Sequence, residues 1–169
     1  PAIFPSQLVT RLIESFTRDT ERVVLDPFCG SGSTVVTASR MGRTGIGFEI
    51  NPEYVELANL RLGQRELFQP EVSTESVIYQ ADARNLREYL EADSVDIVIT
   101  SPPYWDILSQ KRTADGKDIR DYGDTIEDLG KVADYYDFID QLTHVFRPVY
   151  EVMRPGKYCI VVVMDLRKK

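Results

Sequence analysis

The sequence contains few of the side chains from which metal and disulfide sites are built. It has one histidine, His144, and two cysteines, Cys29 and Cys159, which lie far apart in the chain with no other Cys or His nearby. This spacing matches neither a zinc motif nor a disulfide framework. We therefore expect a reduced, cytoplasmic protein without a metal site, in which His144 has a structural role.

Long apolar runs and an excess of basic residues are also absent. The longest apolar run, Tyr158 to Met164, is far shorter than a membrane span, and the N-terminus lacks the layout of a signal peptide. The chain has 20 Lys and Arg against 27 Asp and Glu, a net charge of -7, so no overall basic field attracts nucleic acid. With 43% hydrophobic residues, its 169 residues suffice for one domain with its own core.

Hydrophobic periodicity predicts alternating strands and helices. The predicted strands are residues 21–26, 44–49, 76–80, 95–100 and 157–164, and the predicted helices are residues 8–16 with Ser6 as the cap, 34–41, 52–64, 86–90 and 134–153. This alternation indicates an α/β fold, a doubly wound and mainly parallel sheet with helices on both faces. The sequence begins with Pro1 and stops directly after the fifth strand, so we expect a fragment whose sheet is truncated there.

Several other segments carry simpler interpretations. Residues 106–130 are polar and too long for an ordinary connection, so we expect a functional or mobile loop with poor order. Its basic residues alternate with aspartates, which is typical of a solvated loop; they are Lys111, Arg112, Lys117 and Arg120. We expect Cys159 in the core, and packing roles for Tyr135, Tyr136 and Phe138. Trp105 fits a ligand pocket and core packing equally well.

A glycine-bearing turn, residues 26–34 (DPFCGSGST), follows the first predicted strand. Ligands of a doubly wound sheet bind at the carboxyl ends of its strands, and glycines let the backbone approach a ligand closely. Val35 occupies the third glycine position of the dinucleotide fingerprint, which disfavours NAD or FAD, and no P-loop lysine follows. Glu49 ends the second strand 17 residues after Gly32, about where an acidic side chain binds a ribose diol in this fold class. Asp82 follows the third strand. Its carboxylate could accept a hydrogen bond from an adenine amino group, or it could cap the next helix.

A second motif, Ser101-Pro102-Pro103-Tyr104, follows the fourth predicted strand. Its two prolines fix the backbone and remove two N–H donors, so carbonyl groups are available to a ligand. With residues 26–34, Glu49 and Asp82, this motif resembles the cofactor and catalytic motifs of the amino-methylating DNA methyltransferases. Residues 4–8 (FPSQL) resemble the segment that precedes the cofactor turn in that family.

The resemblance implies that residues 1–169 are a catalytic domain that transfers a methyl group from S-adenosylmethionine to the exocyclic amine of a flipped DNA base. The cofactor-binding residues are then Phe4, Asp26, Pro27, Phe28, Gly30, Gly32, Ser33, Thr34, Glu49, Ile50, Asp82 and Ala83. The catalytic residues are Ser101, Pro102, Pro103 and Tyr104. Ser101 Oγ and the Pro102 carbonyl would accept the amine hydrogens, and Tyr104 would stack on the base.

Alternatives remain open at this point. A serine in the first catalytic position resembles the cytosine-N4 enzymes, ahead of adenine-N6 enzymes, with RNA or free-base amine methylation as a smaller alternative. Cytosine-C5 methylation is disfavoured, because Cys29 sits in the cofactor turn rather than at the base. A non-catalytic S-adenosylmethionine-binding fragment and a Rossmann oxidoreductase are further alternatives. No target-recognition region separates Asp82 from Ser101, so we expect it after residue 169 of a longer parent chain or in a partner subunit. If it is absent, residues 106–130 are the only candidate here.

Overall fold

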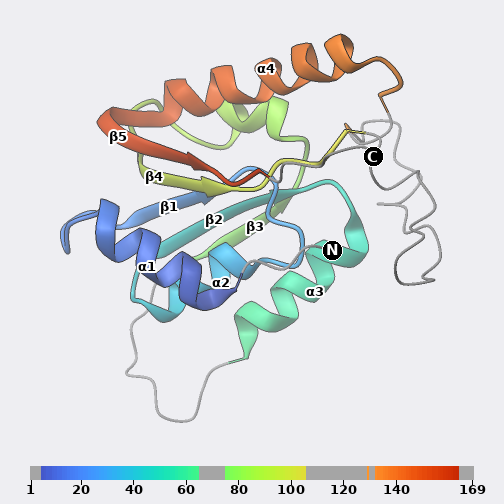
Figure 1. The fold of residues 1–169 in the computed structure, drawn as a ribbon. Helices are drawn as coiled ribbons and strands as arrows, with labels where there is room; N and C mark the ends of the chain where they lie inside the picture. The colour runs from blue at the N-terminus through green and yellow to red at the C-terminus, as the bar shows by residue number, and fades with distance from the viewer. Residues whose placement is uncertain (1–4, 65–74, 106–128, 130–131, 164–169) are drawn as a thin grey trace, which may run out of the picture.

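The computed structural model describes residues 5–64, 75–105, 129 and 132–163 (Figure 1). Within these residues, parallel strands form one sheet in the order β3-β2-β1-β4-β5. The strands are β1 (Val23–Asp26), β2 (Thr44–Glu49), β3 (Val77–Gln80), β4 (Val95–Thr100) and β5 (Met153–Val161). The helices are α1 (Ser6–Phe16), α2 (Ser33–Arg40), α3 (Pro52–Gly63), the short 3-10 helix η1 (Ala83–Glu88) and α4 (Tyr135–Val152). The predicted doubly wound α/β fold is confirmed.

Helices cover both faces of the sheet (Figure 1). On one face lie α1, α2 and α3, and Ile13 of α1 packs in a buried cluster with Val24 and Ile97. On the other face lie η1 and α4, and Val145 of α4 belongs to the cluster that contains Leu25. Successive side chains of a strand point to opposite faces, so the neighbours Val24 and Leu25 enter two different cores. This explains why the apolar residues of β1 are consecutive in the sequence instead of alternating with polar ones.

The strand order reverses between β1 and β4. Val24 of β1 lies opposite Gly45 of β2 on one side and Ile97 of β4 on the other. The chain therefore leaves β1 toward one half of the sheet and enters β4 in the other half. Such a reversal opens a crevice at the carboxyl ends of the two strands, where ligands of this fold class bind.

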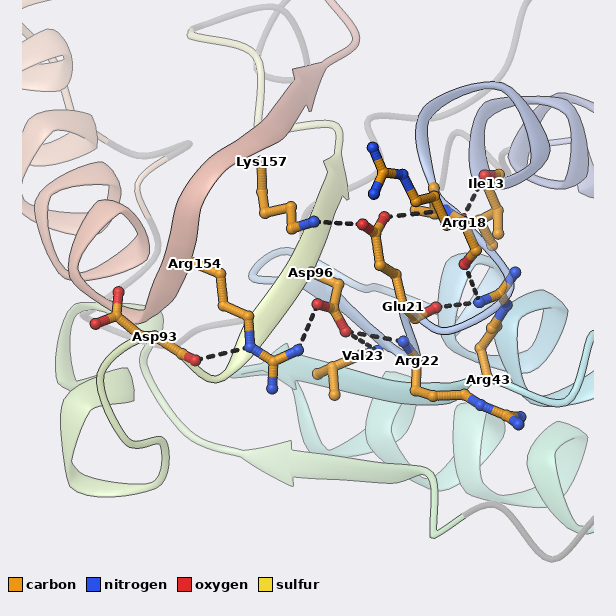
Figure 2. A network of polar contacts seen from close by, with 11 residues as sticks. Ile13, Arg18, Glu21, Arg22, Val23, Arg43, Asp93, Asp96, Arg154 and Lys157 are labelled. Carbon is orange, nitrogen blue, oxygen red and sulfur yellow. Dashed lines mark hydrogen bonds and ion pairs between the residues drawn. The ribbon is translucent and has the colours of Figure 1, made fainter.

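At the amino ends of the strands, opposite the crevice, hydrogen bonds and ion pairs around the buried Asp96 connect neighbouring strands (Figure 2). Asp96 of β4 is 1% exposed, and its Oδ2 accepts hydrogen bonds from the backbone N–H groups of Arg22 (2.8 Å) and Val23 (2.9 Å). Its Oδ1 lies 2.5 Å from Nη1 of Arg154 in β5. A salt bridge between Lys157 and Glu21 links the same segments. One carboxylate thus connects β1, β4 and β5 at the end remote from the crevice.

Several predicted boundaries are wrong, including those of strand 21–26, which is Val23–Asp26, and of helix 86–90, which is Ala83–Glu88. Ser6 is the first residue of α1 rather than its cap, because Pro5 is extended and its carbonyl accepts hydrogen bonds from Leu8 and Val9. The sequence predicts that the last helix ends at residue 153 and the last strand begins at residue 157, yet β5 starts directly after α4 at Met153. The register shifts between the pairs Val95–Met153 and Ile97–Tyr158, so the extra residues form a bulge within the strand.

The outer surface of the molecule also differs from the expectation. Cys159 is exposed rather than buried, because β5 is the last strand of the described sheet. Phe138 is buried as predicted, but Tyr135 and Tyr136 are 47% and 80% exposed. Within the described ranges, the structure contains no helix long and apolar enough to cross a membrane. The prediction for residues 106–128 and 130 lies outside the described residues.

We predict that Asp96→Ala destabilises the protein by about 3 kcal/mol, because two backbone donors and Arg154 lose their common acceptor. Urea denaturation followed by circular dichroism measures this difference. Asp19→Ala is the matched control, since Asp19 is fully exposed and its ion pair with Arg43 spans 3.6 Å; such a pair contributes below about 1 kcal/mol. Equal effects of the two substitutions would contradict the role given to Asp96.

Candidate functional site

A cavity of about 120 Å³ lies at the carboxyl ends of the strands. It is lined by Asp26, Pro27, Phe28, Cys29, Gly30, Ser31, Ser33, Thr34, Phe48, Glu49, Ile50, Tyr54, Ala81, Asp82, Ser101, Pro102, Pro103, Tyr104 and Leu129. The turn after β1, the end of β2, the end of β3 and the corner after β4 all contribute to it. Both sequence motifs therefore face one cavity.

Asp26 is the buried acid at the centre of this site. Its Oδ1 accepts a hydrogen bond from Thr100 Oγ1 at 2.7 Å and from the Phe28 N–H at 3.1 Å. Burial raises the pKa of Asp26 from 3.8 to about 6, although these hydrogen bonds favour the carboxylate. The site thus keeps a carboxylate where a low-polarity environment opposes its charge.

Helix α3 packs against the glycine turn and restrains it. Gly30 and Gly32 have positive φ angles of 50° and 77°. A Cβ on Gly32 would lie 2.8 Å from the Cβ of Ala58, so this position requires glycine for space as well as for conformation. Arg61 Nη1 donates to the Ser31 carbonyl at 2.6 Å and to Ser31 Oγ at 2.9 Å. The turn is therefore fixed before any ligand enters.

Glu49 lies at the end of β2, next to the turn. Its Oε1 accepts a hydrogen bond from the Asn51 N–H at 2.8 Å. Burial raises the pKa of Glu49, and the nearby charge of Asp26 adds to that effect, while backbone N–H groups of Asn51, Gly30 and Ile50 partly offset it. Two carboxylates thus share one buried region, and a positively charged ligand would offset the cost of their burial.

Asp82 lies at the end of β3 and caps η1. Its Oδ1 accepts from the Arg84 N–H and its Oδ2 from Arg84 Nε, both at 2.8 Å. The capping role that the sequence offered for Asp82 is present in the structure. Asp82 also lines the cavity, so capping places its carboxyl group beside the ligand region.

The corner after β4 places Ser101 and Tyr104 opposite the turn. The two hydroxyl groups lie 3.1 Å apart, and Ser101 Oγ donates to the Val162 carbonyl at 3.0 Å. Thr100, the residue before Ser101, bonds to Asp26. Asp26 begins the turn and Thr100 directly precedes the corner, so this hydrogen bond joins the two segments and constrains their spacing.

The cavity contains most, but not all, of the predicted site residues. Gly32 and Ala83 do not line it: Gly32 packs on Ala58, and Ala83 belongs to the main core cluster. Phe4 lies outside the described residues. Trp105 does not line the cavity either, and its indole N–H donates to the Val132 carbonyl at 3.0 Å.

The sequence reasoning missed six lining residues: Cys29, Ser31, Phe48, Tyr54, Ala81 and Leu129. Cys29 and Ser31 lie inside the glycine turn, so the motif itself was a sufficient signal for them. Tyr54 is in the first turn of the helix capped by Asn51, where a side chain points back toward the strand end. No signal in the sequence marks Leu129. Among the described residues, no group of three or more His, Cys, Asp or Glu side chains gathers as a metal site would require.

We predict that Asp26→Asn stabilises the ligand-free protein at pH 8 by up to about 3 kcal/mol. Since the folded pKa is raised from 3.8 to about 6, folding is favoured by protonation, and this stability is lost as the pH rises from about 4 through 6. Asparagine keeps an acceptor oxygen for Thr100 and removes the charge. Thermal unfolding at pH 4 and pH 8 measures the effect. A variant less stable than wild type at pH 8 would contradict it.

We predict that Gly32→Ala destabilises the protein more than Gly30→Ala. Both substitutions force a side chain into a left-handed conformation, which costs about 1 to 2 kcal/mol. Only Gly32→Ala adds a clash, because a Cβ on Gly30 meets nothing within 4 Å. Urea denaturation of both variants separates the clash from the backbone strain, and equal destabilisation would contradict the packing of Gly32 on Ala58.

Residues 1–60 match the model of a DNA methylase family, N6_N4_Mtase. The type II methyltransferase M.ScaI of Streptomyces caespitosus is 44% identical over 62 residues, which cover 37% of this chain and 20% of that protein. The tRNA (guanine(10)-N2)-dimethyltransferase of Methanothermobacter thermautotrophicus is 38% identical over 81 residues, covering 48% of this chain and 21% of that protein. These matches thus span about a fifth of each relative.

Solved structures share the fold at low sequence identity. TrmN from Thermus thermophilus has a TM-score of 0.57 at 17% identity, covering 92% of this chain and 36% of that chain. A SAM-dependent methyltransferase from Methanosarcina mazei has a TM-score of 0.59 at 16% identity, covering 89% of this chain and 55% of that chain. These structures share the predicted doubly wound α/β fold, and the family match over residues 1–60 supports the predicted cofactor, S-adenosylmethionine. The resemblance to the amino-methylating DNA methyltransferases that the motifs predict is confirmed over the matched N-terminal part of the chain.

Proposed function

We propose that this chain transfers a methyl group from S-adenosylmethionine to the exocyclic amino group of a flipped DNA base. The main support for this proposal is that the glycine turn and the Ser101–Tyr104 corner line one cavity. The turn alone would support a nucleotide-binding site of many kinds. The Ser101–Tyr104 corner beside it offers hydrogen-bond acceptors in fixed positions, which supports a reaction on an amine.

The cofactor half of the cavity consists of the turn with Asp26, the end of β2 with Glu49, and Asp82. S-adenosylmethionine supplies an electrophilic methyl group on a positively charged sulfur. The buried carboxylate of Asp26 and the partly buried carboxylate of Glu49 favour a cationic ligand, because its charge offsets the cost of removing them from water. Glu49 would accept hydrogen bonds from the ribose hydroxyls and Asp82 from the adenine amino group. The roles of the other predicted cofactor residues are part of the same proposal.

The catalytic half of the cavity would act on the amine. The lone pair of an amino group attached to a base ring is delocalised, so the nitrogen is a weak nucleophile. Ser101 Oγ and the Pro102 carbonyl would accept hydrogen bonds from the two N–H groups of the amine and favour a pyramidal nitrogen. A nitrogen–carbon bond then forms as the sulfur–carbon bond breaks, and the positive charge that develops on nitrogen is stabilised by these acceptors. The excess proton leaves to water, and S-adenosylhomocysteine is the second product.

Cytosine-N4 is the base position that we favour, followed by adenine-N6. The support is the serine at position 101, which resembles the cytosine-N4 enzymes. Cytosine-C5 methylation is not supported, because it needs a thiolate. Burial and the nearby carboxylates of Asp26 and Glu49 raise the pKa of the Cys29 thiol well above its ordinary value, so the thiol stays protonated at neutral pH.

RNA is the second candidate substrate. The longer of the two matches described above is to a tRNA dimethyltransferase that acts on a guanine N2 amine. The same acceptors at Ser101 and Pro102 would serve such an exocyclic amine. The two candidates differ only in the nucleic acid that reaches the cavity.

The proposal is tested by incubating the protein with methyl-labelled S-adenosylmethionine and unmethylated mixed-sequence DNA, or unmodified tRNA. The nucleic acid is then digested, and the methylated nucleosides are identified by mass spectrometry. We expect N4-methylcytosine from the DNA. N6-methyladenine alone would overturn the base assignment, and label in the tRNA alone would favour the second candidate. Cofactor binding without transfer to either would contradict the proposed reaction.

We predict that Ser101→Ala and Glu49→Ala separate catalysis from cofactor binding. Ser101→Ala should lower the transfer rate at least about 100-fold, since one preorganised acceptor is lost, with cofactor affinity within about twofold of wild type. Glu49→Ala should weaken cofactor binding about tenfold or more. Isothermal titration calorimetry and single-turnover rates measure the two effects, with the surface substitution Glu88→Ala as the control. Wild-type transfer by the Ser101 variant would remove the mechanism.

A further inference from the structure

The side chains of Ser101 and Tyr104 and the backbone of Val162 form a chain of hydrogen bonds at the ends of β4 and β5. Ser101 Oγ lies 3.0 Å from the carbonyl oxygen of Val162 and 3.1 Å from the hydroxyl oxygen of Tyr104. Val162 follows directly after β5, and its N–H donates to the Thr100 carbonyl at 2.9 Å. Both backbone polar groups of Val162 are therefore bound to the end of β4, and Ser101 rests against a fixed backbone.

The direction of each hydrogen bond follows from the available hydrogens. A carbonyl oxygen can only accept, so Ser101 donates its single hydroxyl hydrogen to Val162. Ser101 then has no hydrogen left for Tyr104, and the Tyr104 hydroxyl is the donor to Ser101 Oγ. One lone pair of Ser101 Oγ is occupied by this bond. The other remains available to a ligand in the cavity that both side chains line.

We infer that the Tyr104 hydroxyl and the Val162 carbonyl are positioning groups that orient Ser101 Oγ as an acceptor toward the substrate amine; this inference rests on the proposed function. An unrestrained hydroxyl rotates and in some orientations points its hydrogen at the amine hydrogens, which is repulsive. With its hydrogen held by Val162, Ser101 presents only oxygen lone pairs. Such orientation before the reaction is what makes a dipole effective in the transition state. Tyr104 thus acts through its hydroxyl in addition to the stacking proposed for its ring.

The substitution Tyr104→Phe tests the hydroxyl separately from the ring. We expect the single-turnover rate constant to fall about three- to tenfold, the equivalent of one net hydrogen bond. The affinity for S-adenosylmethionine and the KM for DNA should stay at wild-type values, because the ring is retained. Tyr150→Phe is the matched control, since Tyr150 is 81% exposed on α4 and its variant should react at the wild-type rate. An unchanged rate for Tyr104→Phe would overturn the inference.

A double-mutant cycle tests whether Tyr104 acts through Ser101. In the Ser101→Ala background the residual rate is measured with excess enzyme and labelled cofactor, and adding Tyr104→Phe should cause no further loss. The same fold-loss in both backgrounds would mean that the hydroxyl acts independently of Ser101, which contradicts the inference. Transfer by wild type with no effect of Tyr104→Phe overturns this inference alone. Cofactor binding without transfer by wild type overturns the proposed function, and this inference with it.

Discussion

The carboxylate of Asp26 accepts a hydrogen bond from the Thr100 hydroxyl at the point where the two central strands end. Asp26 opens the glycine turn, and Thr100 directly precedes the Ser101–Tyr104 corner, so this hydrogen bond sets the distance between the two halves of the cavity. Both residues are buried, at 2% and 0% exposed. The same burial that strengthens the bond raises the pKa of Asp26, and the protein retains a carboxylate at a position where its charge is costly.

The two ends of the sheet have different roles. At the amino ends, Asp96 and its partners join β1, β4 and β5 without reaching the cavity. At the carboxyl ends, Asp26 and Glu49 line the cavity and have raised pKa values. Acidic residues therefore connect the strands at one end of the sheet and line the cavity at the other. Part of the net charge of -7, which argues against an overall attraction to nucleic acid, is accounted for by these buried acids.

The central elements were predictable because local and tertiary signals agree there. The bounds of β2 and β4 match the prediction, and Asn51 caps α3 as its Asn-Pro pair indicates. The prediction failed at β5, whose predicted start at residue 157 is too late. Met153 pairs with Val95 and Tyr158 with Ile97, so the residues between Met153 and Tyr158 form a bulge within the strand. The exposure of Cys159 depends on its strand's place in the sheet, which a single-strand pattern does not contain.

The site residues were predictable where they belong to short contiguous motifs or lie at the end of a predicted strand. The glycine turn, Glu49, Asp82 and the Ser101–Tyr104 corner each follow a strand, and parallel strands bring their carboxyl ends to one edge. Leu129 and Val162 reach the site only through tertiary contacts. The Val162 carbonyl belongs to the backbone, so no side-chain pattern could identify it.

We propose that one cavity holds S-adenosylmethionine with its reactive methyl group directed at the Ser101–Tyr104 corner. A crystal structure with an S-adenosylmethionine analogue that carries an amine in place of the sulfonium methyl would reveal this arrangement. The ribose should contact Glu49, and the amine should face Ser101 and Tyr104. An analogue bound outside the cavity, or bound with its amine directed away from Ser101, would show that the proposed arrangement is wrong.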